Sequence, residues 1–253
     1  GVHRSEDGGA HWTKVPLQTS GAYDTDQGSG HVTDTAAEGQ EWIFFLAESG
    51  KTVLAASRYG HLFRSSDGGL HWEPAPGFDG RYIYSLSTRG NTVALGTERG
   101  LSVSTDGGAT WENQYVVYGI TSVTFDGRGN LWAVSRNGLW RYSFETRKVI
   151  SVEKIEGYQW SPFHYFTGVF RGREECILAR DNRGQLVRLA ALQDGDTRRL
   201  ETTTLSNIDI HSFLSLGGNG MLLGTERGFF RSDDGGTNWK QLELPLSGFA
   251  EAR

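Results

Sequence analysis

A short turn motif recurs along the chain, and its repetition constrains the fold more than any other feature. The pattern S-x-D-G-G-x-x-W, which we call the box, begins at Ser5, Ser65, Ser104 and Ser232. Its copies read SEDGGAHW, SSDGGLHW, STDGGATW and SDDGGTNW. The last three serines lie 39 and 128 residues apart, and 128 is close to three steps of 43. A fixed period near 40 residues predicts a repeat architecture with one supersecondary unit per period.

Two degenerate copies fill the long interval between the third and fourth boxes. In GLWRYSFETRKV (138–149) the strand–turn–strand pattern persists, with Tyr142 at the position of the serine. In GQLVRLAALQDGDTRRL (184–200) we place Arg188 at that position. The steps then become 38, 46 and 44, which is a steady period.

Each period contains four short apolar runs separated by glycine turns. The clearest set is RYIYSLST, NTVALGT, GLSVST and ATWENQ, and runs of this length and composition are typical of β-strands. No stretch shows the helical spacing i, i+3, i+4, i+7. Four strands per repeat of about 40 residues predict an all-β fold, a β-propeller of four-stranded antiparallel blades. The blades are expected at 42–76, 81–115, 119–153, 162–204 and 207–244.

Residues 1–16 supply only the outer hairpin of a further blade. Residues 17–41 are too polar and glycine-rich for core strands, and we expect a long loop there that is a lid or a solvated segment. The tail PLSGFAEAR is too short for two strands. We therefore expect one propeller domain over 1–253 with six blades, the first of them incomplete. A seven-bladed ring, with residues missing upstream, is the alternative.

The four boxes resemble the Asp-box, or bacterial neuraminidase repeat, superfamily of propellers. That group includes sialidases, xyloglucan hydrolases, sortilin-type receptors and photosystem II assembly factors. The blades TERGLSVSTDGGATW and GRGNLWAVSRNGLWRYSFETRKV are most similar to the assembly factors and to sensor propellers, which do not catalyse reactions. The resemblance implies an extracytoplasmic location, periplasmic or secreted, although the sequence shows no signal peptide.

The box residues favour a structural role over a catalytic one. An aspartate at a turn can accept main-chain N–H groups, glycines allow positive φ, and a tryptophan can pack between neighbouring sheets. A catalytic acid is not needed once per blade. The residues expected in this role are Asp7, Trp12, Asp67, Trp72, Asp106, Trp111, Asp234 and Trp239.

The other end of each blade is expected to carry the binding surface, because the ligands of the resembled enzymes lie there. Every turn between the second and third strands contains an arginine, namely Arg58, Arg99, Arg136, Arg183 and Arg227. Such turns require glycine but not arginine. Two readings stay open: an anion-binding collar, or exposed turn charges inherited by duplication. Nearby, Tyr158 and Trp160 offer flat apolar surface, with inter-blade packing as the alternative.

Composition and missing motifs restrict the function classes. A net charge of −5 and a pI near 5.8 do not favour nucleic acid, and no apolar run is long enough for a membrane span. The single Cys176 excludes an intrachain disulfide, and no spacing indicates a metal site or a cofactor. Catalytic residues are not identifiable, because the sialidase Phe/Tyr-Arg-Ile-Pro motif and GxSxG are absent. We predict a recognition module for a protein, peptide or anionic glycan, with a sialidase-like or xyloglucanase-like glycoside hydrolase as the alternative.

Overall fold

The structure is a computed structural model, and the described part of the chain consists of strands and turns without a helix. The described residues are 1–17, 42–57, 60–78, 82–115, 119–126, 129–135, 138–154, 168–171, 175–180, 185–191, 197–206, 208, 210–217 and 219–243. The chain divides into two compact units. Unit 1 comprises Gly1–Phe125, Gly129–Arg136 and Trp140–Ile150, and unit 2 comprises Asp126–Arg128, Asn137–Leu139 and Ser151–Arg253.

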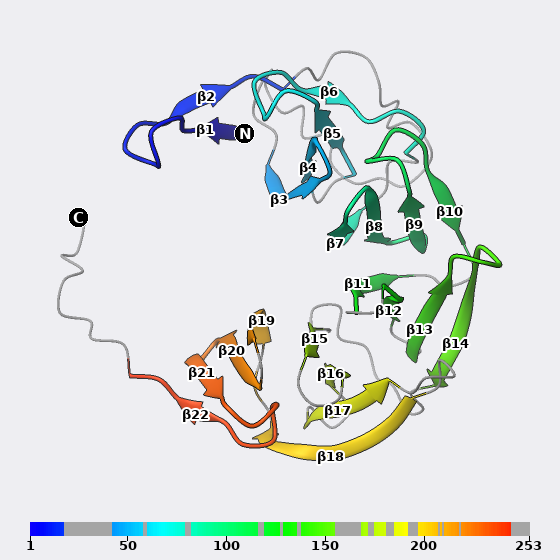
Figure 1. Cartoon of the computed structure of the whole chain (residues 1–253), viewed down its shortest axis with the longest axis vertical. Coiled ribbons are helices and arrows are strands. Elements are labelled where there is room, and N and C mark those ends of the chain that lie inside the picture. Colours follow the sequence, from blue (N-terminus) through cyan, green and yellow to red (C-terminus); the bar gives the residue numbers. More distant parts are fainter. Residues whose placement is uncertain are drawn as a thin grey trace, which may run out of the picture. The chain divides into compact units, whose positions relative to one another are not determined.

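Unit 1 holds one two-stranded sheet and most of three four-stranded sheets (Figure 1). The first sheet is β1 (Val2–Arg4) and β2 (Thr13–Val15). The second is β3 (Ile43–Ser49), β4 (Thr52–Ser57), β5 (Leu62–Ser65) and β6 (Glu73–Pro74). The third is β7 (Ile83–Arg89), β8 (Thr92–Thr97), β9 (Leu101–Ser104) and β10 (Glu112–Gln114). The fourth is β11 (Ile120–Phe125), β12 (Leu131–Ser135), β13 (Gly138–Ser143) and β14 (Lys148–Lys154).

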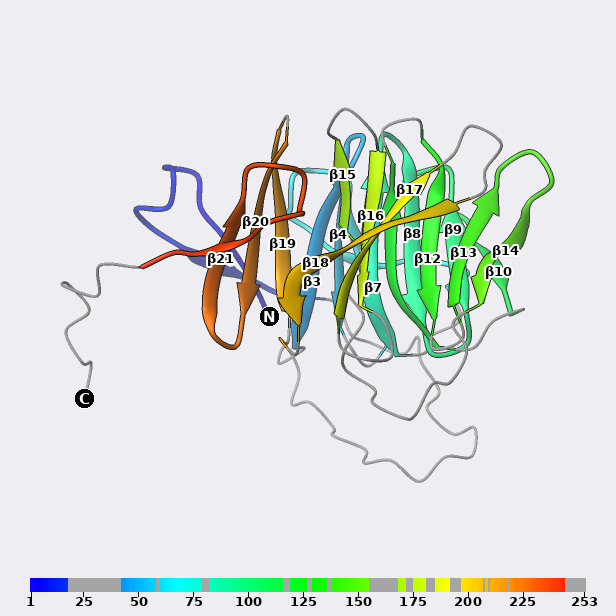
Figure 2. The same ribbon diagram turned by 90° about the horizontal axis from the view of Figure 1, so that it is seen from below.

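Unit 2 holds two further four-stranded sheets. One is β15 (Gly168–Arg171), β16 (Glu175–Arg180), β17 (Gln185–Ala191) and β18 (Thr197–Ser206). The other is β19 (Ile210–Gly217), β20 (Gly220–Thr225), β21 (Gly228–Ser232) and β22 (Lys240–Gln241). In every four-stranded sheet the strands pair in chain order, so the expected antiparallel four-stranded sheets are confirmed. Within each sheet the hairpin turns lie at the ends of the strands (Figure 2).

The register fixes where each box begins relative to its sheet. The box serine pairs with the second residue of the second strand, as in Val53↔Ser65, Val93↔Ser104 and Met221↔Ser232. In the β15–β18 sheet the corresponding pair is Cys176↔Ala190. Ala190, and not Arg188 as predicted, therefore occupies the serine position. The error arose from counting forward from the turn glycine, because the β16–β17 hairpin holds more residues between the paired Cys176 and Ala190 than the β4–β5 hairpin holds between Val53 and Ser65.

Apolar side chains pack between successive sheets of unit 1. Ile83 and Leu95 of the third sheet meet Ala56, Leu62 and Phe78 of the second sheet, and all are buried. Val2 and Val15 of the first sheet pack in the same way on Ala55, Phe63 and Trp72 of the second.

Leu17, the first residue of the predicted loop 17–41, follows β2 without extending the strand. It is 6% exposed and packs with Val2 and Val15. It follows β2 at a position that buries its side chain against the second sheet, which the polar composition of the following residues concealed. Residues 18–41 lie outside the described residues.

Candidate functional site

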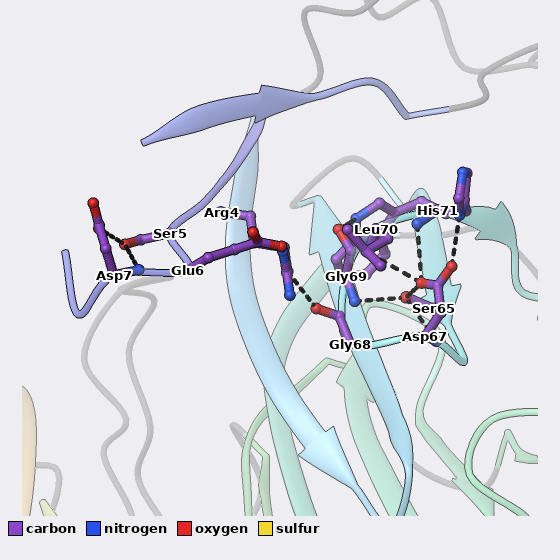
Figure 3. A network of polar contacts seen from close by, with 11 residues as sticks. Arg4, Ser5, Glu6, Asp7, Ser65, Asp67, Gly68, Gly69, Leu70 and His71 are labelled. Carbon is purple, nitrogen blue, oxygen red and sulfur yellow. Dashed lines mark hydrogen bonds and ion pairs between the residues drawn. The ribbon is translucent and has the colours of Figure 1, made fainter. Parts of the chain in front are cut away.

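The aspartate and serine of each box close the turn through hydrogen bonds. Asp67 Oδ1 accepts the N–H groups of Leu70 and His71, both at 3.0 Å, and Ser65 Oγ donates to the same oxygen at 2.7 Å. The Ser65 hydroxyl in turn accepts the N–H of Gly69 at 2.8 Å. Figure 3 shows this box and the first one, which are linked where Arg4 Nε donates to the carbonyl of Gly68 at 3.0 Å. In the other three boxes Asp7, Asp106 and Asp234 accept the N–H groups of His11, Thr110 and Asn238, each at 2.9 Å.

The box tryptophan is bonded to its own turn in all four copies. Trp72 Nε1 donates to the carbonyl of Gly69 at 3.1 Å, and Trp12, Trp111 and Trp239 donate to the equivalent carbonyls at 3.0, 3.2 and 3.0 Å. Trp72 is 3% exposed because the first sheet covers it. Trp12, by contrast, is 63% exposed, since no described sheet of unit 1 lies over it. The expectation that this tryptophan packs between sheets therefore does not apply to Trp12 within the described residues.

The same hydrogen bonds hold the box carboxyls in the ionised form. The backbone N–H of His11, with the His11 ring and the Ser5 hydroxyl, lowers the pKa of Asp7 to about 2. Burial raises the pKa of Asp106, but hydrogen bonds from Thr110 and Ser104 outweigh that effect and lower it to about 2. The pKa of Asp67 is lowered chiefly by the backbone N–H of His71. Carboxyls of this kind carry no proton to donate near neutral pH, which is unsuitable for a general acid.

The third and the last sheet each have a box end and an opposite end. The box of the third sheet lies beside the β7–β8 turn, because Gly107 N–H donates to the carbonyl of Asn91 at 2.8 Å. In the last sheet Gly235 N–H donates likewise to Asn219, at 3.0 Å. The β8–β9 turn instead bonds to Tyr82, just before β7, through Glu98 N–H at 3.0 Å. The β8–β9 and β20–β21 turns therefore lie at the end of their sheets that is opposite the box.

Two of the five predicted arginines, Arg99 and Arg227, fall within the described residues, and both sit in a TERG turn. In the β8–β9 turn Thr97 Oγ1 donates to the Gly100 carbonyl at 2.9 Å, and Gly100 adopts φ of 144°. In the β20–β21 turn Thr225 Oγ1 donates to the Gly228 carbonyl at 2.8 Å, and Gly228 has φ of 99°. Threonine and glycine thus form the same turn in both units, and the closing hydrogen bonds do not require arginine.

The arginine of the TERG turn has a carboxylate as its chain neighbour. Arg227 Nε lies 3.5 Å from Glu226 Oε1, and the Arg227 side chain is 60% exposed. The main chain of this turn is also anchored, because Gln241 Nε2 donates to the Arg227 carbonyl at 2.6 Å. An anionic partner would therefore exchange a weak, solvated ion pair for its own contact with the guanidinium. Glu98 precedes Arg99 in the same way.

The other predicted binding residues lie outside the described residues. These are Arg58, Arg136, Arg183, Tyr158 and Trp160.

A tyrosine–glutamate pair, in which the tyrosine is buried, links the third sheet to the fourth, whose box is degenerate. Tyr142 OH donates to Glu112 Oε2 at 2.7 Å, and Arg147 Nη1 donates to Glu112 Oε1 at 2.5 Å. Burial, and then the hydrogen bond to Glu112, raises the pKa of Tyr142 well above its usual value. Tyr142 is only 3% exposed. A protonated, covered phenol is the opposite of an activated nucleophile, so this pair serves to join β10 to β13.

An exposed apolar face on β3 escaped the sequence analysis. Trp42, Phe44 and Leu46 are 67%, 52% and 60% exposed, whereas Ile43 and Phe45, between them, pack into the two core clusters of the second sheet. The signal was available in the run Trp42-Ile43-Phe44-Phe45-Leu46, which is apolar at every position and does not alternate. Such a run is typical of a strand covered on both faces.

The described residues contain no group of three or more His, Cys, Asp or Glu side chains placed to hold a metal ion. Within the same part of the chain, no helix has the length and apolar character needed to cross a bilayer.

No protein-family model matches the chain. Among curated proteins, the vacuolar protein sorting/targeting protein 10 of Aspergillus fumigatus is 30% identical over 89 residues, which cover 32% of this chain and 6% of that protein. The chain therefore spans a small part of the curated relatives that it matches.

Several solved structures are similar to the chain in fold. The extracellular domain of the putative hybrid two component system BT4673 from B. thetaiotaomicron has a TM-score of 0.58 at 16% identity, covering 80% of this chain and 30% of that one. YCF48 from Cyanidioschyzon merolae has a TM-score of 0.57 at 17% identity, covering 79% and 71%. YCF48 bound to D1 peptide has a TM-score of 0.53 at 19% identity, covering 77% and 66%. These likenesses show the fold, a β-propeller of four-stranded antiparallel sheets, as predicted.

Proposed function

We propose that this chain is a non-catalytic recognition propeller of the Asp-box kind, which binds an acidic segment of a protein partner through its arginine turns. The observation that carries the proposal is that threonine and glycine, and not arginine, close the TERG turns. Thr97 and Gly100 close one turn and Thr225 and Gly228 the other, so neither turn needs the side chain of Arg99 or Arg227 for its closing hydrogen bonds. The proposed surface extends to Arg58, Arg136 and Arg183, which lie in the corresponding turns of the sequence, and to Tyr158 and Trp160.

The similar structures support a binding role over a catalytic one. YCF48 has been solved with a D1 peptide, and the BT4673 structures are extracellular domains of a putative one component or hybrid two component system. An extracytoplasmic location is part of the proposal for the same reason. The four box carboxyls are engaged in turns, and Tyr142 is buried and donates to Glu112. None of these groups supports the hydrolase alternative.

Charge reversal at the two described arginines tests the surface. We expect the chain to bind a fluorescein-labelled decamer of glutamate, and the Arg99→Glu/Arg227→Glu variant to bind it about tenfold more weakly, because two attractive contacts become repulsive. The affinity of the unaltered chain should also fall as salt is raised, since exposed charges are screened. Fluorescence anisotropy measures both effects.

A matched control keeps this test specific. Lys51 is exposed in the β3–β4 turn, at the box end of its sheet, and Lys51→Glu reverses a charge away from the arginine turns. We expect Lys51→Glu to leave peptide affinity unchanged, and all variants to retain the melting temperature. If Lys51→Glu weakens peptide binding as much as the arginine variant does, the binding depends on overall charge and not on the arginine turns. Preferential capture of sialyllactose or heparin oligosaccharide would favour a glycan partner, and turnover of a fluorogenic sialoside or a β-glucan oligomer would replace the proposal by the hydrolase.

A further inference from the structure

The residue before the box tryptophan contacts the second carboxylate oxygen of the box aspartate through its side chain in all four copies. In the third box the Thr110 hydroxyl donates to Asp106 Oδ2 at 2.6 Å, and in the last box the Asn238 amide donates to Asp234 Oδ2 at 2.7 Å. In the other two boxes the residue is a histidine, and its ring takes the same place. The turn therefore requires a donor at this position, which threonine or asparagine supplies as well as histidine does.

The second box shows the histidine version of this contact (Figure 3). His71 Nδ1 lies 2.6 Å from Asp67 Oδ2, and the backbone N–H of His71 donates to Oδ1 of the same carboxylate at 3.0 Å. The first box repeats the contact, with His11 Nδ1 at 2.5 Å from Asp7 Oδ2. In both boxes the ring is therefore held at one of its two nitrogens.

The direction of the ring hydrogen bond follows from the other contacts of the carboxylate. Asp67 Oδ1 accepts the Ser65 hydroxyl and two backbone N–H groups, and an ionised carboxylate has no proton to donate. His71 Nδ1 therefore carries the hydrogen and donates it to Oδ2. Since a neutral imidazole has one donor nitrogen and one acceptor nitrogen, Nε2 of His71 is left with a lone pair.

The acceptor nitrogen belongs to a ring that is open to solvent. The side chain of His71 is 87% exposed, and that of His11 is 91% exposed. The second sheet packs on the first sheet through one core cluster and on the third sheet through another, so both of its neighbours belong to the described part of the chain. Neither neighbour covers the His71 ring.

This arrangement has the geometry of a metal-binding histidine and its supporting carboxylate. A histidine that ligates a metal ion usually donates its other ring N–H to a carboxylate, a carbonyl group or water, and this bond fixes the tautomer and the orientation of the ring. At His71 the box aspartate accepts this bond, so the ring is oriented before an ion binds. The carboxylate also places a negative charge behind the ring, which attracts a cation.

We propose that His71 is a surface ligand for a divalent transition-metal ion of the Zn²⁺ type, bound through Nε2, and that His11 is the repeat of this site in the first box. Imidazole nitrogen is a suitable ligand for Zn²⁺, Cu²⁺ and Ni²⁺, whereas Mg²⁺ and Ca²⁺ prefer oxygen. Among the described residues no group of three or more His, Cys, Asp or Glu side chains gathers around either ring. The ion therefore keeps open coordination positions, which water or a ligand from another molecule fills.

The test begins with the tautomer and the metal binding of each ring, measured in the full chain by nitrogen-15 nuclear magnetic resonance at neutral pH. The ring nitrogen chemical shifts should show hydrogen on Nδ1 and a lone pair on Nε2 in both His71 and His11. ZnCl₂, a probe without redox chemistry, should then shift the Nε2 resonance of each ring in a saturable manner. Hydrogen on Nε2 of His71, or a shift that does not saturate, would overturn the proposal.

Asp67→Asn tests whether the supporting carboxylate is required. The asparagine carbonyl replaces Oδ1 as the acceptor of the turn, so its amide group faces the ring and donates to Nδ1, which places the hydrogen of His71 on Nε2. We expect the affinity of His71 for Zn²⁺ to fall about tenfold or more, the effect of losing a supporting bond. His11 in the same molecule should keep its affinity and serves as the internal control. An unchanged affinity at His71 would overturn the proposal.

His71→Asn is the matched variant for the fold, because the last box carries asparagine at this position. It should keep the melting temperature and should bind one Zn²⁺ fewer than the unaltered chain in equilibrium dialysis, and it repeats the test if Asp67→Asn does not fold. Equal Zn²⁺ affinity at every histidine, or an unchanged number of bound ions in His71→Asn, would mean an adventitious ion only. The Arg99→Glu/Arg227→Glu variant should bind Zn²⁺ normally, so this proposal and the proposed function fail independently.

Discussion

At the scale of the residue, the box aspartate works as a hydrogen-bond acceptor rather than as a reactive group. Asp106 Oδ1 accepts the N–H groups of Ala109 and Thr110, and Oδ2 accepts the Thr110 hydroxyl at 2.6 Å. Removing the acceptor in Asp106→Ala should lower the free energy of unfolding at pH 7 by about 0.5–2 kcal/mol, the range for loss of a comparable cap. Urea unfolding of the two proteins measures the difference.

The pH dependence of that difference follows from the depressed pKa. The pKa of Asp106 is about 2 in the folded protein, and an unfolded aspartate titrates near 3.9. The ionised form therefore stabilises the fold fully above about pH 4, and this stabilisation is lost as the pH falls through 2. The difference in the free energy of unfolding between the unaltered chain and Asp106→Ala should become smaller over this interval. The difference between the unaltered chain and Glu48→Gln, an exposed substitution outside the boxes, should not show this decrease. A gap that stays constant from pH 7 to pH 2 would contradict the role of the charge.

The sequence of the box predicted which residues form its turn, but it did not predict how deeply the tryptophan of each copy is buried. Trp12 and Trp72 occupy the same motif and make the same bond to a glycine carbonyl, yet one is 63% and the other 3% exposed. Burial depends on the neighbouring sheet, which the motif does not encode. Leu17 shows the converse case, because a single leucine beside a polar stretch gives no periodic signal of its burial.

At the scale of the element, polar contacts to one carboxylate join the fourth sheet, whose box is degenerate, to the third sheet. Tyr142 of β13 donates to Glu112 of β10, and Arg147 joins the same carboxylate from the β13–β14 turn. Tyr142→Phe should lower the free energy of unfolding by about 1.5–3 kcal/mol, the range for a hydrogen bond to a charged group. A double-mutant cycle with Glu112→Gln should show a coupling of at least about 0.5 kcal/mol. Additive effects of the two changes would mean that the hydroxyl and the carboxylate act separately.

Strand content and strand order were predictable at this scale, whereas the register within each hairpin was not. Period-two and continuous apolar runs located the strands because main-chain pairing and burial impose those patterns. The serine position in the β15–β18 sheet was misplaced from Ala190 to Arg188, since more residues separate the paired positions in this hairpin than in the β4–β5 hairpin. The arginines were found because they recur in turns, but recurrence alone does not say whether they bind a partner.

At the scale of the whole molecule, a repeat architecture confines the effect of a core change to neighbouring sheets, because each sheet packs on the next. Leu95 and Leu223 are both fully buried, the first in the cluster between the second and third sheets and the second in the cluster of unit 2 with Leu205 and Ile208. Leu95→Ala should cost about 2–5 kcal/mol of local stability and speed hydrogen exchange in β4 and β8, while the amides of β20 keep their protection. Leu223→Ala should produce the reverse pattern.

Hydrogen exchange followed by peptide-level mass spectrometry distinguishes local destabilisation of neighbouring sheets from cooperative unfolding of the whole domain. If Leu95→Ala and Leu223→Ala each accelerate exchange equally in β8 and β20, the sheets unfold together, and the expectation that the effect stays within neighbouring sheets is wrong.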